Sequence, residues 1–235
     1  TDTANLHRFK SRTGITERGF EVFLSQDIFL EEEPGWFLKP PDIRLTPEDK
    51  IYIYFTSGTT GKPKAIVGKN KSLSHFIKWE IETFNINQQF RTSQLITPVF
   101  DAFLRDIFVP FCAGGVLCIP ENPAVILNPH TLVQWLEKLK INLVHCVPTL
   151  FRLLNSKSLD GNSLKTLKFI LLSGEKIDPA ELVNWYNTIG DRIQLVNFYG
   201  PTETTMIKSY YLIQPSDVKR ERIPIGKPMR GCRLM

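Results

Sequence analysis

Short apolar runs alternate with amphipathic segments along the chain after residue 50. The runs, each of a length typical of a buried strand, are residues 51–55, 94–97, 116–119, 143–147, 169–172 and 193–196. Apolar positions at helical spacing follow the first run, from Leu73 to Phe84, with Glu80 as one polar interruption. Two more amphipathic segments, around Trp135 and Trp185, are entered near a proline. The alternation predicts an α/β fold with mostly parallel sheets covered by helices on both faces.

A segment rich in glycine and hydroxyl side chains follows the first apolar run. It reads Thr56-Ser57-Gly58-Thr59-Thr60-Gly61-Lys62-Pro63-Lys64. The glycines allow a tight turn and a close approach to a ligand, and the lysines can neutralise a polyphosphate. A plain hairpin turn between strands is the alternative. A Walker loop is excluded, because only two residues separate the glycines and a proline follows Lys62.

A second unusual segment, Asn197-Phe198-Tyr199-Gly200-Pro201-Thr202-Glu203, comes directly after the last apolar run. In open α/β sheets, ligands bind beyond the carboxyl ends of the strands. Thr56, Asp101, His145, Ser173 and Asn197 each lie at or after the end of an apolar run. Their positions predict one composite site at a sheet edge.

The two segments, in this order and with Phe100-Asp101 between them, resemble the core motifs of the adenylate-forming superfamily. That superfamily includes acyl-CoA ligases, luciferases and the adenylation domains of nonribosomal peptide synthetases, and the wording from Tyr54 to Lys64 is most similar to the last. The resemblance covers residues 46–235 and implies part of the large N-terminal core of such an enzyme. Residues 1–45 carry no motif and are predicted to be an irregular lead-in to that core.

The resemblance implies that a carboxylate attacks the α-phosphorus of ATP, which releases pyrophosphate and leaves an acyl-adenylate. It assigns the phosphates to Thr56, Ser57, Gly58, Thr59, Thr60, Gly61, Lys62 and Lys64. Thr202 would contact the α-phosphate and Glu203 would ligate magnesium, for which a carboxylate is a suitable ligand. Tyr199 would carry the adenine, with Ser173, Gly174, Glu175, Asn197, Phe198 and Gly200 alongside. Taken alone, Glu203 is equally typical of a surface helix cap and Tyr199 of a core position.

The same resemblance places an amino-acid pocket around Asp101, which would pair with the α-ammonium group of the substrate. The implied pocket walls are Ala102, Arg105, His145, Leu171, Ser173, Phe198, Met206 and Ile207. A buried arginine is costly unless it meets an anion, and its planar fork matches a carboxylate. Arg105 therefore favours an acidic, aspartate-like or glutamate-like substrate. The alternative is that Asp101 and Arg105, four residues apart, form a surface pair on a helix.

Composition narrows the other classes of function. The net charge is +5, but the basic residues are scattered and no reader motif accompanies them, so no nucleic-acid partner is predicted. No stretch is apolar for long enough to cross a membrane, and the polar N-terminus lacks the apolar segment of a signal peptide, which favours a cytoplasmic protein. The four cysteines form no Cys-x-x-Cys pair and are predicted to be free thiols.

The expected function is activation of an amino acid with ATP and magnesium, followed by loading onto the phosphopantetheine of a carrier protein, beside a condensation domain of the same synthetase. By the same resemblance the chain stops before the domain that bears the catalytic lysine, so it is expected to be an internal part of an adenylation domain. The alternatives are an acyl-CoA or fatty-acyl-AMP ligase, which Asp101 disfavours, and a nucleotide-binding module without catalysis.

Overall fold

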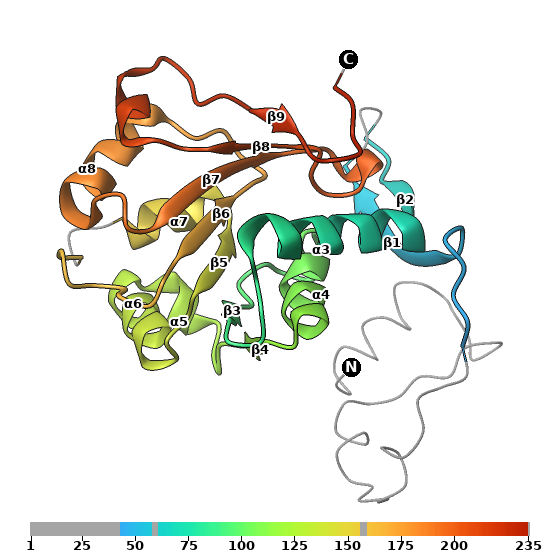
Figure 1. Ribbon diagram of the computed structural model, residues 1–235, viewed down its shortest axis with the longest axis horizontal. Coiled ribbons are helices and arrows are strands. Elements are labelled where there is room, and N and C mark those ends of the chain that lie inside the picture. Colours follow the sequence, from blue (N-terminus) through green and yellow to red (C-terminus); the bar gives the residue numbers. More distant parts are fainter. Residues whose placement is uncertain (1–42, 58–60, 156–158, 235) are drawn as a thin grey trace, which may run out of the picture. The chain divides into compact units, whose positions relative to one another are not determined.

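The computed structural model describes residues 43–57, 61–155 and 159–234 (Figure 1). The contacts within the chain separate residues 1–44 from a second compact unit, Leu45–Met235, and the fold described below is that of the second unit. It contains a two-stranded sheet and a seven-stranded sheet. The small sheet is an antiparallel hairpin of β1 (Lys50–Thr56) and β2 (Lys64–Lys69).

The large sheet has the strand order β4-β3-β5-β6-β7-β8-β9. Its parallel strands are β3 (Arg91–Ser93), β4 (Val116–Cys118), β5 (Leu143–Cys146), β6 (Phe169–Leu172) and β7 (Gln194–Tyr199). Two antiparallel strands, β8 (Ser209–Leu212) and β9 (Lys227–Pro228), extend one edge. The prediction of a mostly parallel sheet is confirmed.

Helices cover both faces of this sheet (Figure 1). One face packs on α3 (Asn70–Phe84) and α4 (Phe103–Ala113), and the other packs on α6 (Pro129–Lys138), α7 (Pro148–Leu154) and α8 (Pro179–Ile189). Strand residues alternate between the two cores, because successive side chains point to opposite faces. Leu143 and Leu171 belong to the α3/α4 core, whereas Val144 and Ile170 belong to the α6/α7/α8 core. The predicted two-sided covering is confirmed.

Three shorter helices complete the elements that the structure describes. They are α5 (Ala124–Leu127) and the 3-10 helices η1 (Thr202–Thr204) and η2 (Pro215–Lys219). The predicted entry of α6 and α8 near a proline is confirmed, since Pro129 and Pro179 are their first residues. Side chains of Asn128 and Asp178 accept hydrogen bonds from the backbone at these two starts, which satisfies amides that a helix leaves free.

Two details of the predicted pattern are wrong. The apolar run 94–97 is not a strand, because the strand of this region is Arg91–Ser93 and the amides of Leu95 and Ile96 donate to the Asp106 carboxylate instead of to a neighbouring strand. The run 51–55 is a strand, but it pairs only with β2 and stays outside the large sheet. The motif that follows it therefore does not lie at the edge of the parallel sheet.

No helix within the described ranges is long and apolar enough to cross a membrane. The four cysteines, all in the described part of the chain, are free thiols, as predicted. Cys118 and Cys146 are buried, but burial is a wrong expectation for Cys112, which lies in an apolar stretch and is exposed.

Candidate active site

A cavity of about 350 Å³ lies beside the carboxyl ends of β6 and β7. Its lining includes six of the residues assigned from the sequence to the adenine side, namely Gly174, Glu175, Asn197, Phe198, Tyr199 and Gly200. The seventh, Ser173, is buried directly before Gly174. Tyr199 is 52% exposed, so its ring is available to stack on a flat ligand rather than being part of the core. The structure thus gathers the adenine-side residues around one hollow.

The strand β7 leaves this cavity through a tight turn that begins at Gly200. A Cβ atom added at Gly200 would collide with the carbonyl oxygen of Met206 and lie 2.6 Å from the Cα of Ile207, so two stretches of backbone touch here. Thr205 and Met206 both have left-handed φ angles, of 70° and 53°. Glycine is therefore required at this position, and the turn holds η1 in a fixed place.

The turn presents Thr202 and Glu203, the residues assigned to the α-phosphate and magnesium. Glu203 is exposed and Thr202 is half-buried. Within the described ranges no group of three or more His, Cys, Asp or Glu side chains is placed to hold a metal ion. A single carboxylate is nevertheless the donor set that suits Mg²⁺ where substrate phosphates supply the remaining ligands. Glu203 fits that role.

The segment that begins at Thr56 connects the two strands of the β1–β2 hairpin. It is therefore a hairpin connection, as the alternative expected, and this does not exclude a phosphate-binding role. Thr56 pairs with Lys64 at the loop end of the hairpin, and Gly61 has a φ of 78°. Lys62 and Lys64 are exposed, as a contact with an anion requires. The predicted phosphate contacts Gly58, Thr59 and Thr60 lie outside the described residues.

A hydrogen bond joins the strand before the first motif to the turn after the second motif, which are far apart in the sequence. The hydroxyl of Tyr52 on β1 donates to Oγ1 of Thr205, at 3.4 Å. The hairpin therefore lies beside the turn that carries Glu203, although it belongs to a different sheet.

Asp101 lies just before α4 and is 8% exposed. Its Oδ2 accepts a hydrogen bond from the amide of Met206, at 3.2 Å, and its other oxygen, Oδ1, remains for a cation. Met206 belongs to the turn that starts at Gly200 at the rim of the cavity. This contact links the proposed ammonium-binding residue to the nucleotide cavity.

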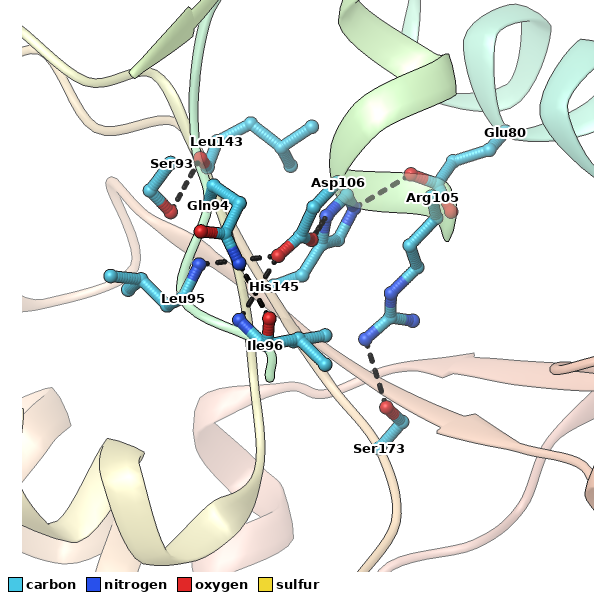
Figure 2. A network of polar contacts seen from close by, with 10 residues as sticks. All are labelled: Glu80, Ser93, Gln94, Leu95, Ile96, Arg105, Asp106, Leu143, His145 and Ser173. Atoms are coloured by element: carbon cyan, nitrogen blue, oxygen red, sulfur yellow. Dashed lines mark hydrogen bonds and ion pairs between the residues drawn. The ribbon is translucent and has the colours of Figure 1, made fainter. Parts of the chain in front are cut away.

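Arg105, one helical turn after Asp101, is fully buried, with 0% of its surface exposed. Its Nη2 donates to Oγ of Ser173 at 2.9 Å (Figure 2). Its guanidinium carbon lies 5.6 Å from the centre of the Phe198 ring, within range of a cation–π contact. Its Nε and Nη1 have no hydrogen-bond partner among the described residues. No ion pair with Asp101 forms in that part of the chain. The surface-pair alternative for Arg105 is therefore wrong.

His145 on β5 lies between two buried carboxylates (Figure 2). Its Nδ1 is 2.8 Å from Oδ1 of Asp106, and its Nε2 is 2.7 Å from Oε1 of Glu80. All three side chains are fully buried. Burial alone would lower the pKa of His145, but Coulombic attraction from Glu80 and hydrogen bonds to both carboxylates outweigh burial and the repulsion from Arg105, so the pKa is raised.

Both ring nitrogens of His145 are thus occupied by protein groups, and the ring is not free to contact a substrate. Leu171, Phe198, Met206 and Ile207 are buried in the core shared with α3 and α4, and Ala102 is half-buried. Sequence reasoning missed both carboxylates, Asp106 and Glu80, and only Glu80 had a signal in the sequence. Its signal was the single acidic position inside the apolar stripe of α3, since a carboxylate facing a core requires a buried partner.

The profile of the AMP-binding enzyme family matches residues 6–235. The chain belongs to this family of adenylate-forming ligases. Among its relatives is the nonribosomal peptide synthetase GRA1 of Gibberella zeae, which is 32% identical over 211 residues, covering 90% of this chain and 2% of the synthetase. The chain thus spans a very small part of that relative.

Solved adenylation domains share the fold. The Vibrio cholerae adenylation domain AlmE, in complex with glycyl-adenosine-5'-phosphate, is 28% identical with a TM-score of 0.68, covering 78% of this chain and 34% of AlmE. PA1221, a nonribosomal peptide synthetase protein containing adenylation and PCP domains, is 27% identical with a TM-score of 0.68, covering 80% and 37% of the two chains. Both are similar to this chain over most of its length.

Proposed function

We propose that residues 46–235 form the core of an adenylation domain that joins an amino acid to AMP. The substrate carboxylate forms a bond to the α-phosphorus of ATP and pyrophosphate leaves. The observation that carries this proposal is the hydrogen bond from Met206 to Asp101, because it links the cavity lined by Tyr199 to the carboxylate suited to an α-ammonium group. The aminoacyl-adenylate bound to AlmE supports the same reaction class.

Each side chain has a positioning or electrostatic role in this proposal. Tyr199 stacks on the adenine, Lys62 and Lys64 neutralise the leaving pyrophosphate, and Thr202 contacts the α-phosphate. Glu203 holds the magnesium ion, which supplies charge neutralisation on the phosphates when bound. Asp101 orients the amino acid through its ammonium group, so the α-carboxylate faces the nucleotide.

The substrate in this proposal has an acidic side chain. A guanidinium that is fully buried, with two N–H groups lacking partners among the described residues, requires an anion to offset its desolvation. A side-chain carboxylate of an aspartate-like or glutamate-like amino acid supplies such an anion, and it can accept a charge-assisted hydrogen bond from a free N–H of the guanidinium. Ser173 and Phe198 hold the guanidinium in the orientation that this contact needs.

The aminoacyl group then passes to the phosphopantetheine of a carrier protein in a cytoplasmic synthetase that also has a condensation domain. The PCP domain in PA1221 supports a carrier partner. The decisive test is exchange of labelled pyrophosphate into ATP by the intact adenylation domain, across a panel of amino acids and of carboxylic acids that lack an amine. Exchange with amino acids only is expected. Silence with every compound would refute adenylation, and exchange with acids lacking an amine would favour an acyl ligase.

Replacement of Glu203 by glutamine should lower kcat/KM for exchange about a hundredfold, because it removes the charge that holds the metal ion against the phosphates. The melting temperature should stay the same, since Glu203 is exposed. Exchange kinetics at several magnesium concentrations check the result. Glu121→Gln is the matched control, because Glu121 is also exposed and lies far along the chain from every proposed site residue. Unchanged kinetics in Glu203→Gln would remove Glu203 from the site.

A further inference from the structure

Two carboxylates and two cations are buried together beneath α3 and α4. Glu80 comes from α3, Asp106 and Arg105 from α4, and His145 from β5 (Figure 2). Both carboxylates contact His145, and neither forms an ion pair with Arg105 within the described part of the chain. His145 is a much weaker base than Arg105, yet it contacts both carboxylates. The guanidinium of Arg105 is therefore left without a carboxylate partner, although it is the group that is always charged.

The geometry also fixes the number of protons in this trio. A neutral imidazole donates from one nitrogen only, yet both nitrogens of His145 lie within 2.8 Å of a carboxylate oxygen. Glu80, His145 and Asp106 together therefore carry one proton more than a neutral imidazole beside two ionised carboxylates. The second Asp106 oxygen accepts from the amides of Leu95 and Ile96, whereas Oε2 of Glu80 has no partner among the described residues. Glu80 is thus the carboxylate that depends most on His145.

We propose that His145 is a positioning residue that occupies Glu80 and Asp106, so that Arg105 stays free to bind the anionic side chain of the amino acid. The inference rests on the proposed role of Arg105 as a carboxylate receptor. Without the charge on His145, Glu80 would be a buried carboxylate with no counter-ion. The only other fully buried cation of the described chain is Arg105, and Glu80 would then compete with the substrate for its unpartnered nitrogens. Selectivity is then set by a residue that never touches the substrate.

The proposal has a defined pH dependence. The raised pKa of His145 means that its charge persists above about pH 6.5, the ordinary pKa of histidine, and is lost as the pH rises through the raised value. The groups that face the ring are Glu80 from α3 with Asp106 and Arg105 from α4, and the neighbouring Cys146 stays neutral because burial raises its pKa to about 12. Above the transition Glu80 competes for Arg105. The preference for an acidic amino acid should then fall with rising pH.

The test compares glutamate with glutamine, and aspartate with asparagine, in pyrophosphate exchange by the intact adenylation domain. The acid-to-amide ratio of kcat/KM cancels the titration of the α-amino group, which the two members of each pair share. His145→Gln should lower the ratio for the preferred acid about tenfold or more, mainly through KM for the acid, with KM for ATP unchanged. The double variant Glu80→Gln, His145→Gln removes the competing carboxylate as well. It should recover the ratio to within about threefold of the wild type.

A role confined to folding would not give this recovery, because the double variant lacks the whole Glu80–His145 contact. Glu82→Gln is the control on the same helix, since Glu82 is exposed and pairs only loosely with Lys78 at 3.8 Å. It should leave the ratio unchanged. A His145→Gln variant that folds and keeps the wild-type ratio overturns the proposal, as does a double variant that stays as unselective as the single one.

A wild-type titration covers the case in which His145→Gln does not fold. The acid-to-amide ratio of the wild type should fall as the pH is raised from about 6.5, the ordinary pKa of histidine, through the raised pKa of His145, and that of the double variant should stay constant. A constant wild-type ratio overturns the role of His145 while the acid preference stands. A wild type that exchanges but does not prefer an acid overturns the receptor role of Arg105 and this inference together. Absence of all exchange refutes the proposed function itself.

Discussion

Replacement of Gly200 by alanine is expected to destabilise the protein by about 3 kcal/mol or more and to abolish ATP binding. The added methyl group would overlap the carbonyl oxygen of Met206 and approach the backbone of Ile207 and Lys208. Backbone cannot move aside as a flexible side chain does, and this backbone is already held by the hydrogen bond from the Lys208 amide to the Tyr199 carbonyl, at 2.8 Å. The turn must open, and with it the placement of Glu203. Thermal unfolding and titration with ATP measure the two effects.

Gly161→Ala is the matched control for this substitution. A Cβ atom at Gly161 would have Thr188 as its nearest neighbour, at an ordinary distance of 3.6 Å, and its φ angle is not left-handed. Its stability should change by less than about 1 kcal/mol. If Gly200→Ala melts like the wild type and binds ATP, the close packing of the turn against β7 is wrong.

Much of the fold follows from the spacing of apolar residues, because the sheet is buried on both faces. Strands with helices on each side have continuous apolar sequences, and residues 169–172 are such a run and form β6 with the same bounds. The run 94–97, Gln-Leu-Ile-Thr, is also apolar at its centre but forms no strand. There the Asp106 carboxylate binds the amides of Leu95 and Ile96, a long-range contact that local pattern does not contain. The local sequence likewise could not show that β1 pairs only with β2, because the partner of a strand depends on tertiary contacts.

Some residues of the candidate site could be expected from local sequence, and others depend on how the helices pack on the sheet. The residues that the resemblance assigns to the adenine side could be expected to lie together, because they occupy two short contiguous segments, one at the end of β6 and one along β7. The environment of Arg105 could not, because its burial and its contact with Ser173 depend on how α4 packs on the sheet. Glu80 was visible only as an acidic residue in an apolar stripe. Its pairing with His145 joins positions 65 residues apart.

The second large effect is expected from a change at Arg105. The burial of this residue decides between its two interpretations, a surface pair with Asp101 and a receptor for a substrate carboxylate. A surface pair with Asp101 would leave the guanidinium exposed, and the pair would stabilise the helix by about a few tenths of a kcal/mol. Instead it is fully buried, donates one hydrogen bond to Ser173 and lies over the Phe198 ring. A neutral side chain in the pocket would leave Nε and Nη1 desolvated without a partner. Under the proposed acidic specificity, we therefore expect the guanidinium to penalise neutral substrates as well as to attract acidic ones, and the discrimination to combine both effects.

Arg105→Ala should consequently cost about 2 to 5 kcal/mol of discrimination in favour of the acid, the range for truncating one member of a buried charge pair. Exchange rates for glutamate, glutamine and leucine in the wild type and the variant measure it. The loss should be concentrated in the acid, because neutral amino acids make no contact with the guanidinium and gain from its removal. Arg222→Ala, at an exposed position, should change none of the three rates. A wild type that prefers leucine or glutamine would defeat the acidic assignment and leave adenylation intact, because Asp101 and the cavity at Tyr199 do not depend on Arg105.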